Sequence, residues 1–243
     1  IDYSLRTNVP SAMRVEAVAA LSTWAKPSVL DRVDGRFRGE ITRDAGPVRE
    51  RAAEPLNRLM SSNDKDLRLG AVKAVGKLKV TSASENLFTR LKSDANADVR
   101  AEALKSIVGL EDARTGEAIR QALQDKEKSV RVVALDLLPK TDMPREEMVA
   151  LLTDVIETKT TEEKQAALLT LGTLRSPAAE KVVDGLLSKL NEGKLSREIQ
   201  LELAEAVDSL KSGKLKARMA TITARLAPDS LMAAYSSVLA GGD

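Results

Sequence analysis

Several short stretches carry residue types that do chemistry in other proteins, but each falls short of the full pattern. "GAVKAVGK" at 70–77 has the glycines and lysine of a phosphate-binding loop, yet five residues separate the glycines and Leu78 follows the lysine. The loop pattern needs four residues and then Ser or Thr. "SNDK" at 62–65 has a Ser-x-x-Lys spacing without the partner motifs of such hydrolases. The glutamates at 146–147 and 162–163 are adjacent, so on a helix they point about 100° apart rather than toward each other.

The composition also argues against catalysis. The chain has no His and no Cys, which removes the commonest general base, the commonest metal ligand and any thiolate or disulfide. The formal net charge is +2, so the chain has no strong attraction to nucleic acid or an acidic membrane. No apolar run reaches the ~20 residues that span a bilayer. We therefore predict no catalytic residue, no metal site, no cofactor, no membrane span and no enzyme, with nucleic acid disfavoured as a partner.

The elements that carry these residues repeat along the chain. An apolar residue, a basic residue and, three further on, an Ala recur in "DVRAEALKSIVGL" (98–110) and "DLRLGAVKAVGKL" (66–78). We call the basic residue the anchor, and the steps between anchors are 54, 32, 31, 33 and 33 residues. Such a period is typical of stacked repeats. The anchors are Arg14, Arg68, Arg100, Arg131, Lys164 and Arg197.

Each repeat has the pattern of two helices joined by a turn. In the 98–110 copy, Val99, Ala103 and Ile107 recur every fourth residue, which is one apolar helix face. A second helical segment lies between successive copies, as at 46–60 and 82–93. Short polar residues that favour turns and helix starts stand six positions before every anchor. They are Asn8, Ser62, Asp94, Asp125, Thr158 and Asn191.

The frame D-x-x-x-x-V-R-x-x-A in helix pairs of ~32 residues resembles HEAT repeats, of the short kind related to bilin-lyase HEAT-like units. The resemblance covers nearly all of residues 8–240 and implies an all-α, right-handed α-α superhelix of about six to seven helix pairs, one domain over 1–243. It also implies a structural ladder of turn carboxylates and arginines along the stack. The residues expected in that ladder are Arg14, Arg68, Asp94, Arg100, Asp125 and Arg131.

The long first step places an insertion at about 26–45, between the first and second repeats. It follows Trp24, which stands ten residues after its anchor and is predicted to lie in the core. Pro27 ends a helix, and "DG" at 34–35 is typical of a turn. The insertion is either a structural lock between repeats or a basic contact loop. Its contact residues would be Arg32, Arg36, Phe37 and Arg38.

In a HEAT stack the second helix of each pair lines the concave surface, which predicts a charged inner face. We expect a non-catalytic scaffold that binds a protein or a neighbouring domain of the same chain with this face. The alternatives are a solvated polar face, or a nucleic-acid-binding or lyase-type protein that uses the same groove. The predicted inner-face residues are Lys73, Lys77, Glu102, Lys105, Asp136 and Glu202.

The two ends suggest a piece of a longer chain. The sequence starts at Ile1, and "LMAAYSSVLAGG" at 231–242 is apolar on both sides of a helix, so we expect it to be covered, for instance by self-association. Residues 10–39 are similar to the HEAT segment of large exported bacterial proteins, in which a propeller dehydrogenase-like domain precedes the repeats and a cytochrome c domain follows. That resemblance implies an exported location.

Overall fold

The computed structural model describes residues 1–31 and 33–226 of the chain. Within these residues the chain is all-α, as predicted, and its extended backbone pairs only at an antiparallel bridge between Leu30 and Phe37. The chain divides into two compact units, unit 1 at Ile1–Asp142 and unit 2 at Met143–Asp243. The single repeat domain over 1–243 stays a prediction.

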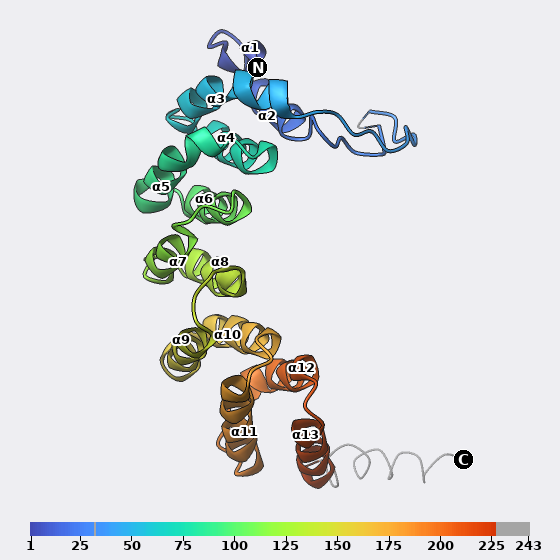
Figure 1. Cartoon of the computed structure of the whole chain (residues 1–243), viewed down its shortest axis with the longest axis vertical. Helices are drawn as coiled ribbons and strands as arrows, with labels where there is room; N and C mark the ends of the chain where they lie inside the picture. Colours follow the sequence, from blue (N-terminus) through green and yellow to red (C-terminus); the bar gives the residue numbers. More distant parts are fainter. Residues whose placement is uncertain (32, 227–243) are drawn as a thin grey trace, which may run out of the picture. The chain divides into compact units, whose positions relative to one another are not determined.

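Unit 1 is a stack of helix pairs in two layers (Figure 1). The even-numbered helices pack in order, each against the next, and form the inner layer. Each odd-numbered helix from α3 to α7 packs against the even-numbered helix that follows it. The helices are α1 (Asp2–Leu5), α2 (Ser11–Ser22), α3 (Gly46–Met60), α4 (Lys65–Leu78), α5 (Ser84–Ser93), α6 (Ala97–Gly109), α7 (Thr115–Leu123) and α8 (Lys128–Leu137), with short 3₁₀ turns η1 (Thr81–Ala83) and η2 (Leu138–Lys140).

Two inner helices of unit 1, α4 and α6, begin at side-chain caps. The Asp64 carboxylate accepts hydrogen bonds from the backbone N–H groups two and three residues later, and the Asn96 side chain does the same. These caps satisfy N–H groups that have no partner inside the helix. They stand four residues before the anchors, so the helix start lies two residues later than the predicted position. The residues six before the anchors close the preceding turn instead, at Ser62, Asp94 and Asp125.

Small residues let the inner helices of unit 1 approach closely. The alanine three residues after the anchor is fully buried in α4, α6 and α8. A Cβ added at Gly76 of α4 would lie only 2.5 Å from Ser106 Oγ and 2.9 Å from Ser106 Cβ of α6. The Ser106 hydroxyl is itself used, because it donates a 3.0 Å hydrogen bond to the carbonyl of Val72. The α4–α6 contact is therefore fixed by both shape and a buried polar link.

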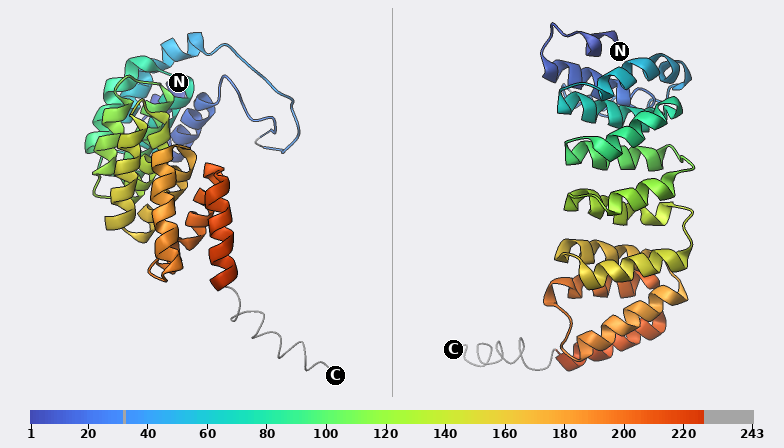
Figure 2. Two further views of the ribbon diagram at one scale, coloured as in Figure 1. Left: turned by 60° about the horizontal axis from the view of Figure 1, so that its bottom comes forward. Right: turned by 90° about the vertical axis from the view of Figure 1, so that its left-hand side faces the viewer.

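Unit 2 repeats the same arrangement of pairs, seen in two further views in Figure 2. Its inner helix α10 packs along α12, and α11 contacts both α9 and α13 in the other layer. The Glu163 carboxylate accepts from the backbone N–H and the hydroxyl of Thr160, which fixes the start of α10. The described elements are α9 (Arg145–Thr158), α10 (Thr161–Thr173), α11 (Pro177–Asn191), η3 (Arg197–Ile199), α12 (Gln200–Leu210) and α13 (Gly213–Leu226). The predicted self-associating segment at 231–242 lies outside the described residues.

Residues 23–45, which we call the arm, contain no helix among their described positions and leave the stack between α2 and α3 (Figure 1). The prediction that Trp24 lies in the core is wrong. Helix α2 ends at Ser22, so Trp24 falls beyond the helix face that would have buried it, and it is 42% exposed. The guanidinium of Arg43 covers its ring at 4.8 Å from the centroid, and Arg43 also donates to the Trp24 carbonyl at 3.1 Å. This stacking closes the base of the arm.

Candidate functional site

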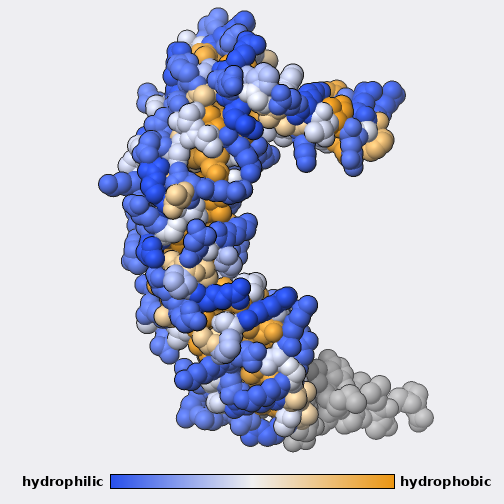
Figure 3. All heavy atoms as spheres, viewed as in Figure 1, coloured by the Kyte–Doolittle hydropathy of each residue, from blue (hydrophilic) through white to orange (hydrophobic). Residues whose placement is uncertain are grey.

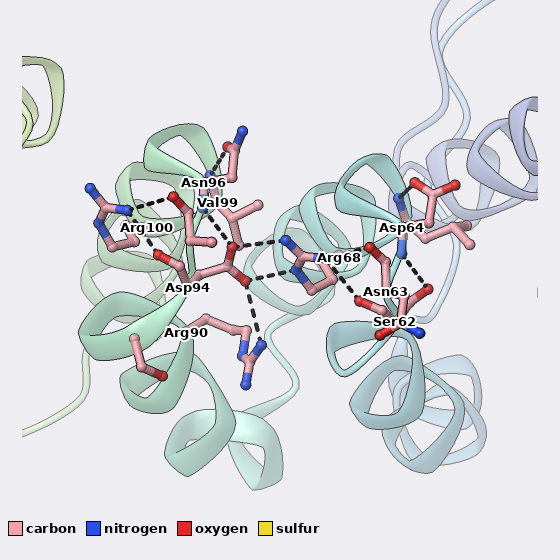
Figure 4. A network of polar contacts seen from close by, with 12 residues as sticks. Ser62, Asn63, Asp64, Arg68, Arg90, Asp94, Asn96, Val99 and Arg100 are labelled. Carbon is pink, nitrogen blue, oxygen red and sulfur yellow. Dashed lines mark hydrogen bonds and ion pairs between the residues drawn. The ribbon is translucent and has the colours of Figure 1, made fainter.

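Arg68 and Arg100 each tie one turn of unit 1 to the next, and Figure 4 shows the link made by Arg68. Arg68 donates from Nε and Nη2 to the two carboxylate oxygens of Asp94, at 2.8 and 3.0 Å. Its Nη1 also donates to the carbonyls of its own turn, at Ser62 and Asn63. A two-point arginine–carboxylate contact is both strong and geometrically specific. The anchor of one repeat therefore holds the turn of the next repeat as well as its own.

The next rung has the same geometry with deeper burial. Arg100 is only 3% exposed and donates to both oxygens of Asp125 at 2.7 Å. Its Nη1 donates to the carbonyl of Asp94 at 2.8 Å, and Arg131 donates in the same way to the carbonyl of Asp125. These contacts align the inner helices α4, α6 and α8 along one side of unit 1.

Arg14 departs from this pattern. Its Nε donates to the carbonyl of Ser4 at 2.9 Å. The turn of the next repeat has Ser62 where the later turns have Asp94 and Asp125, so no carboxylate stands there to receive the Arg14 side chain.

The ladder carboxyls stay ionised despite their burial. Burial raises the pKa of Asp94, but hydrogen bonds from Arg68 and from the backbone N–H of Asn96 outweigh it and lower the pKa. At Asp125, burial likewise raises the pKa, and Arg100 together with the backbone N–H of Glu127 reverses the effect. Both effects follow from charge and hydrogen-bond stabilisation of the ionised form.

We expect acid to weaken unit 1. A carboxyl with a lowered folded pKa stabilises the fold above its unfolded pKa, and that stabilisation is lost as the pH falls through the folded pKa. For Asp112 the folded pKa is about 2, chiefly because Arg114 donates to its carboxylate. The urea midpoint, followed by circular dichroism, should therefore fall steadily from about pH 5 to about pH 2. The carboxyls of unit 1 with lowered pKa are Asp31, Asp64, Asp94, Asp112 and Asp125.

The variant Asp112→Asn should lower the midpoint at neutral pH and reduce the difference between neutral and acid pH, because one of these carboxyls is gone. Equal urea midpoints for the unsubstituted chain at about pH 5 and about pH 2 would contradict the prediction.

The inner layer of unit 1 contains a groove of about 850 Å³ across α2, α4 and α6. Its floor is mainly apolar and consists of small or medium side chains, with Val15 and Leu69 as the largest. Charged residues flank this floor, and Ser28 at the base of the arm also lines it. The lining residues are Ser11, Ala12, Val15, Ala19, Ser22, Thr23, Ser28, Asp64, Asp66, Leu69, Gly70, Lys73, Lys77 and Glu102.

The charges along the groove are not evenly compensated. At one end the Asp64 carboxylate accepts a hydrogen bond from the Ser11 hydroxyl, which lowers the pKa of Asp64, and Asp66 pairs with Lys65 at 3.1 Å. At the other end Lys73 and Lys77 are exposed and form no ion pair within the described residues. Two like charges four residues apart on a helix repel each other. The groove therefore has an acidic end with partners and a basic end without them.

The structure distributes the predicted inner-face residues over three places. Lys73, Lys77 and Glu102 line the groove, and Glu102 pairs with Lys105 at 3.6 Å. Lys105 and Asp136 line a second hollow of about 640 Å³ between α6 and α8. Glu202 belongs to α12 of unit 2, where its Oε2 is buried and has no hydrogen-bond partner within the described residues.

The charged side chains at the tip of the arm lie close to one another. Arg38 contacts the carboxylates of Asp31 and Asp34 at 3.2 and 3.1 Å, and Arg36 Nε lies 3.7 Å from Asp34 Oδ2. The turn that brings these groups together needs Gly35, whose φ is +70°, a region that favours glycine. Phe37 is 72% exposed between these paired charges.

Exposed apolar side chains gather on the arm, as Figure 3 shows. The described ones are Val29, Leu30, Val33, Phe37 and Ile41. The predicted contact residue Arg32 lies outside the described residues. The contact role of Arg36, Phe37 and Arg38 stays a prediction; in the described part of the arm, Arg36 and Arg38 lie against Asp31 and Asp34 beside exposed apolar side chains.

The comparisons with known proteins bear on the fold. No family model matches the sequence, and no curated protein matches it. The crystal structure of an engineered protein superposes with a TM-score of 0.50 at 19% identity, over 85% of this chain and 94% of that one. The chain is a helical-repeat protein.

A second solved structure is more distant. The complex of CpcE and CpcF of phycocyanin lyase from Nostoc sp. PCC7120 has a TM-score of 0.38 and 16% identity, over 86% of this chain and 85% of that chain. The prediction that this repeat chain is not an enzyme is corrected by this finding, because a helical chain similar to it belongs to a lyase complex. The likeness assigns no reaction to the chain.

The described residues contain no cluster that could hold a metal. Among residues 1–31 and 33–226, no group of three or more Asp or Glu side chains is placed to hold an ion. In the same part of the chain no helix is both long and apolar enough to cross a bilayer.

Sequence reasoning missed the apolar floor of the groove. Val15 and Leu69 each follow an anchor directly, and Ala19 stands at the repeat position that Lys73 takes in the next copy. The signal was present, because the first repeat has apolar residues at inner-face positions where the second has Asp66 and Lys73.

Proposed function

We propose that unit 1 is a protein-binding module that holds a segment of a partner in the groove across α2, α4 and α6, beside the arm. The observation that carries the proposal is the apolar floor, open along three inner helices and flanked by exposed lysines that form no ion pair with any described residue. Apolar grooves on a helical surface are a common mode of recognising a partner segment. The partner is another protein or a neighbouring domain of a longer chain, and the chemistry of the contact is the same for both.

The arm supplies a second contact in this proposal. Its base lines the groove at Ser28, and its tip exposes Phe37 and Val33, the latter 97% exposed. A contiguous cluster of exposed apolar side chains often marks a contact site. A segment in the groove would therefore extend onto the arm at the end near Lys77.

Protein is favoured over nucleic acid because the groove carries both signs of charge. Asp64, Asp66 and Glu102 share the groove with the two lysines. Carboxylates would repel a phosphate backbone, whose binding depends on lysine and arginine. An exported location and a spacer role between two domains stay expectations of the resemblance to exported bacterial proteins.

A small molecule is the second candidate occupant, in line with a lyase-type function. The groove volume of about 850 Å³ lies within the range of small-molecule sites, and its lining is more apolar than polar. Peptide selection separates the two candidates. A site specific for a small molecule of other chemistry would not enrich peptides.

The test selects peptides as long as α4, which has 14 residues, from a random display library on the immobilised full chain. We expect Leu69→Asp to weaken binding of the selected peptides at least about tenfold, because a charge replaces an apolar part of the floor. Leu69 is not part of the buried core, so the variant should keep its helix content.

Leu201→Asp is the matched control, since Leu201 is 67% exposed on α12 in unit 2. Its peptide affinities should equal those of the unsubstituted chain. Failure to enrich any peptide, or equal affinities for the Leu69→Asp chain, would refute the groove as a protein-binding site.

A further inference from the structure

The charges of the groove also indicate what kind of segment it takes and in which direction. We infer that the occupant is an amphipathic helix whose acidic residues lie over Lys73 and Lys77, with its acidic end toward the arm. This inference rests on the proposed function, because it concerns the same groove. The proposed function states only that a protein segment binds. This inference adds the charge of that segment and the direction in which it lies.

The apolar contact favours a helix. Ala12, Val15 and Ala19 lie on one face of α2 at helical spacing, and Leu69 and Gly70 lie opposite on α4. Small side chains along two neighbouring helices let a third helix backbone approach closely, with Val15 and Leu69 as the ridges between which its apolar stripe packs. Val15 and Leu69 are equivalent positions in successive repeats, and Ala12, Val15 and Ala19 follow the axis of α2, so the floor runs along the helices.

The basic end favours acidic side chains. Lys73 and Lys77 are one helical turn apart, so their ammonium groups repel each other until a partner brings carboxylates. Glu102 also faces the groove, but its carboxylate is paired with Lys105. Two acidic residues one turn apart on the occupant would match the spacing of the two lysines and relieve their repulsion.

The acidic end sets the direction. Asp66 and Lys77 are separated by eleven residues on α4, or about 16 Å along its axis at 1.5 Å per residue. This separation exceeds the screening length of about 8 Å at physiological salt, so the two ends act on a ligand independently. Asp64 and Asp66 would repel an acidic end, whereas the lysine end attracts it. A helix with charge at one end is therefore held in one direction.

Both inner helices start at the same end of the groove. Ser11 at the start of α2 donates to Asp64 at the cap of α4, so the two helices run side by side in the same direction. Thr23, after the end of α2, accordingly lies at the Lys77 end. Trp24 follows Thr23 and is the only tryptophan in the chain, so its fluorescence reports on the end of the groove that should receive the acidic residues.

The experiment uses two synthetic amphipathic peptides as long as α4 with identical apolar stripes, one with acidic residues at one end and one with lysines there. With the full chain, the acidic peptide should bind about tenfold more tightly than the basic one in low salt. The double variant Lys73→Glu/Lys77→Glu should abolish or reverse this preference. Lys181→Glu/Lys189→Glu on α11 changes the net charge equally and should leave the preference intact.

Orientation is measured by a nitroxide quencher on either end of the acidic peptide. Stronger quenching of Trp24 by the label at the acidic end is expected. Equal quenching from both ends would contradict the proposed orientation of the helix. Equal affinities for the acidic and basic peptides would contradict its proposed acidic character. Neither result would contradict the groove as a peptide-binding site. Absence of binding by either peptide, together with no loss in Leu69→Asp, would instead refute the proposed function.

Discussion

Replacing Asp125 by alanine is expected to destabilise unit 1 by about 3–5 kcal/mol, the usual cost of removing one partner of a buried ion pair. Arg100 would keep its charge at 3% exposure and would still donate hydrogen bonds to the carbonyls of Asp94 and Ala95. Chemical denaturation of the full chain, followed by circular dichroism, measures the loss. Hydrogen exchange should locate it in α6 and α8, the helices that this rung joins.

Two variants separate the ion pair from a general effect of charge. Asp136→Ala removes an exposed carboxylate from α8 and should change the free energy of unfolding by no more than about 0.5 kcal/mol. The double variant Arg100→Met/Asp125→Leu removes both charges and should recover most of the stability, because buried ion pairs are often replaceable by apolar residues. A loss below about 1 kcal/mol in Asp125→Ala would show that Arg100 finds other partners or water.

The repeat period predicted the helix pairs well because each pair carries its own local signals. The anchor, the alanine three residues later and the polar turn residues recur at fixed offsets, and helix propensity does not depend on distant contacts. The partners of the ladder were harder to foresee. Arg68 pairs with Asp94 of the following repeat, 26 residues away, and this pairing exists only once the repeats are stacked.

The arm shows the limit of the same reasoning. Its place followed from the step of 54 residues between the first two anchors, but its form did not. The net charge of a loop says nothing about which charges meet, and the contacts of Arg38 with Asp31 and Asp34 depend on the backbone turn at Gly35. Trp24 was misplaced because the repeat register was extended past the actual end of α2.

The groove was predicted in part. Lys73, Lys77 and Glu102 of the groove were among the predicted inner-face residues, whereas its Asp64 and Asp66 were not. Its floor was not predicted, because Val15 and Leu69 have the same apolar character as core residues in a single sequence. Only the stacking of α2 on α4 shows that these two side chains face the open side of the groove.

Gly172 should tolerate no side chain, and Gly172→Val is expected to destabilise unit 2 by about 2–3 kcal/mol through overpacking. A Cβ at this position of α10 would lie 2.8 Å from Ala206 Cα and 3.2 Å from the Ala206 carbonyl oxygen of α12. These are backbone atoms, so the clash is relieved only if the two helices move apart. Sequence analysis did not single out this glycine, although a glycine inside a helical pattern is a recognised signal of close packing.

Gly185 provides the matched control for this prediction. It lies within α11 of the same unit, and a Cβ there would meet nothing within 4 Å. Gly185→Ala should therefore stabilise the chain by about 0.5–1 kcal/mol, the ordinary gain from replacing glycine in a helix. The same gain would apply to Gly172→Ala if packing were irrelevant. A stabilising Gly172→Ala would thus contradict the close α10–α12 contact, whereas opposite signs at the two glycines would show that helix packing outweighs helix propensity in unit 2.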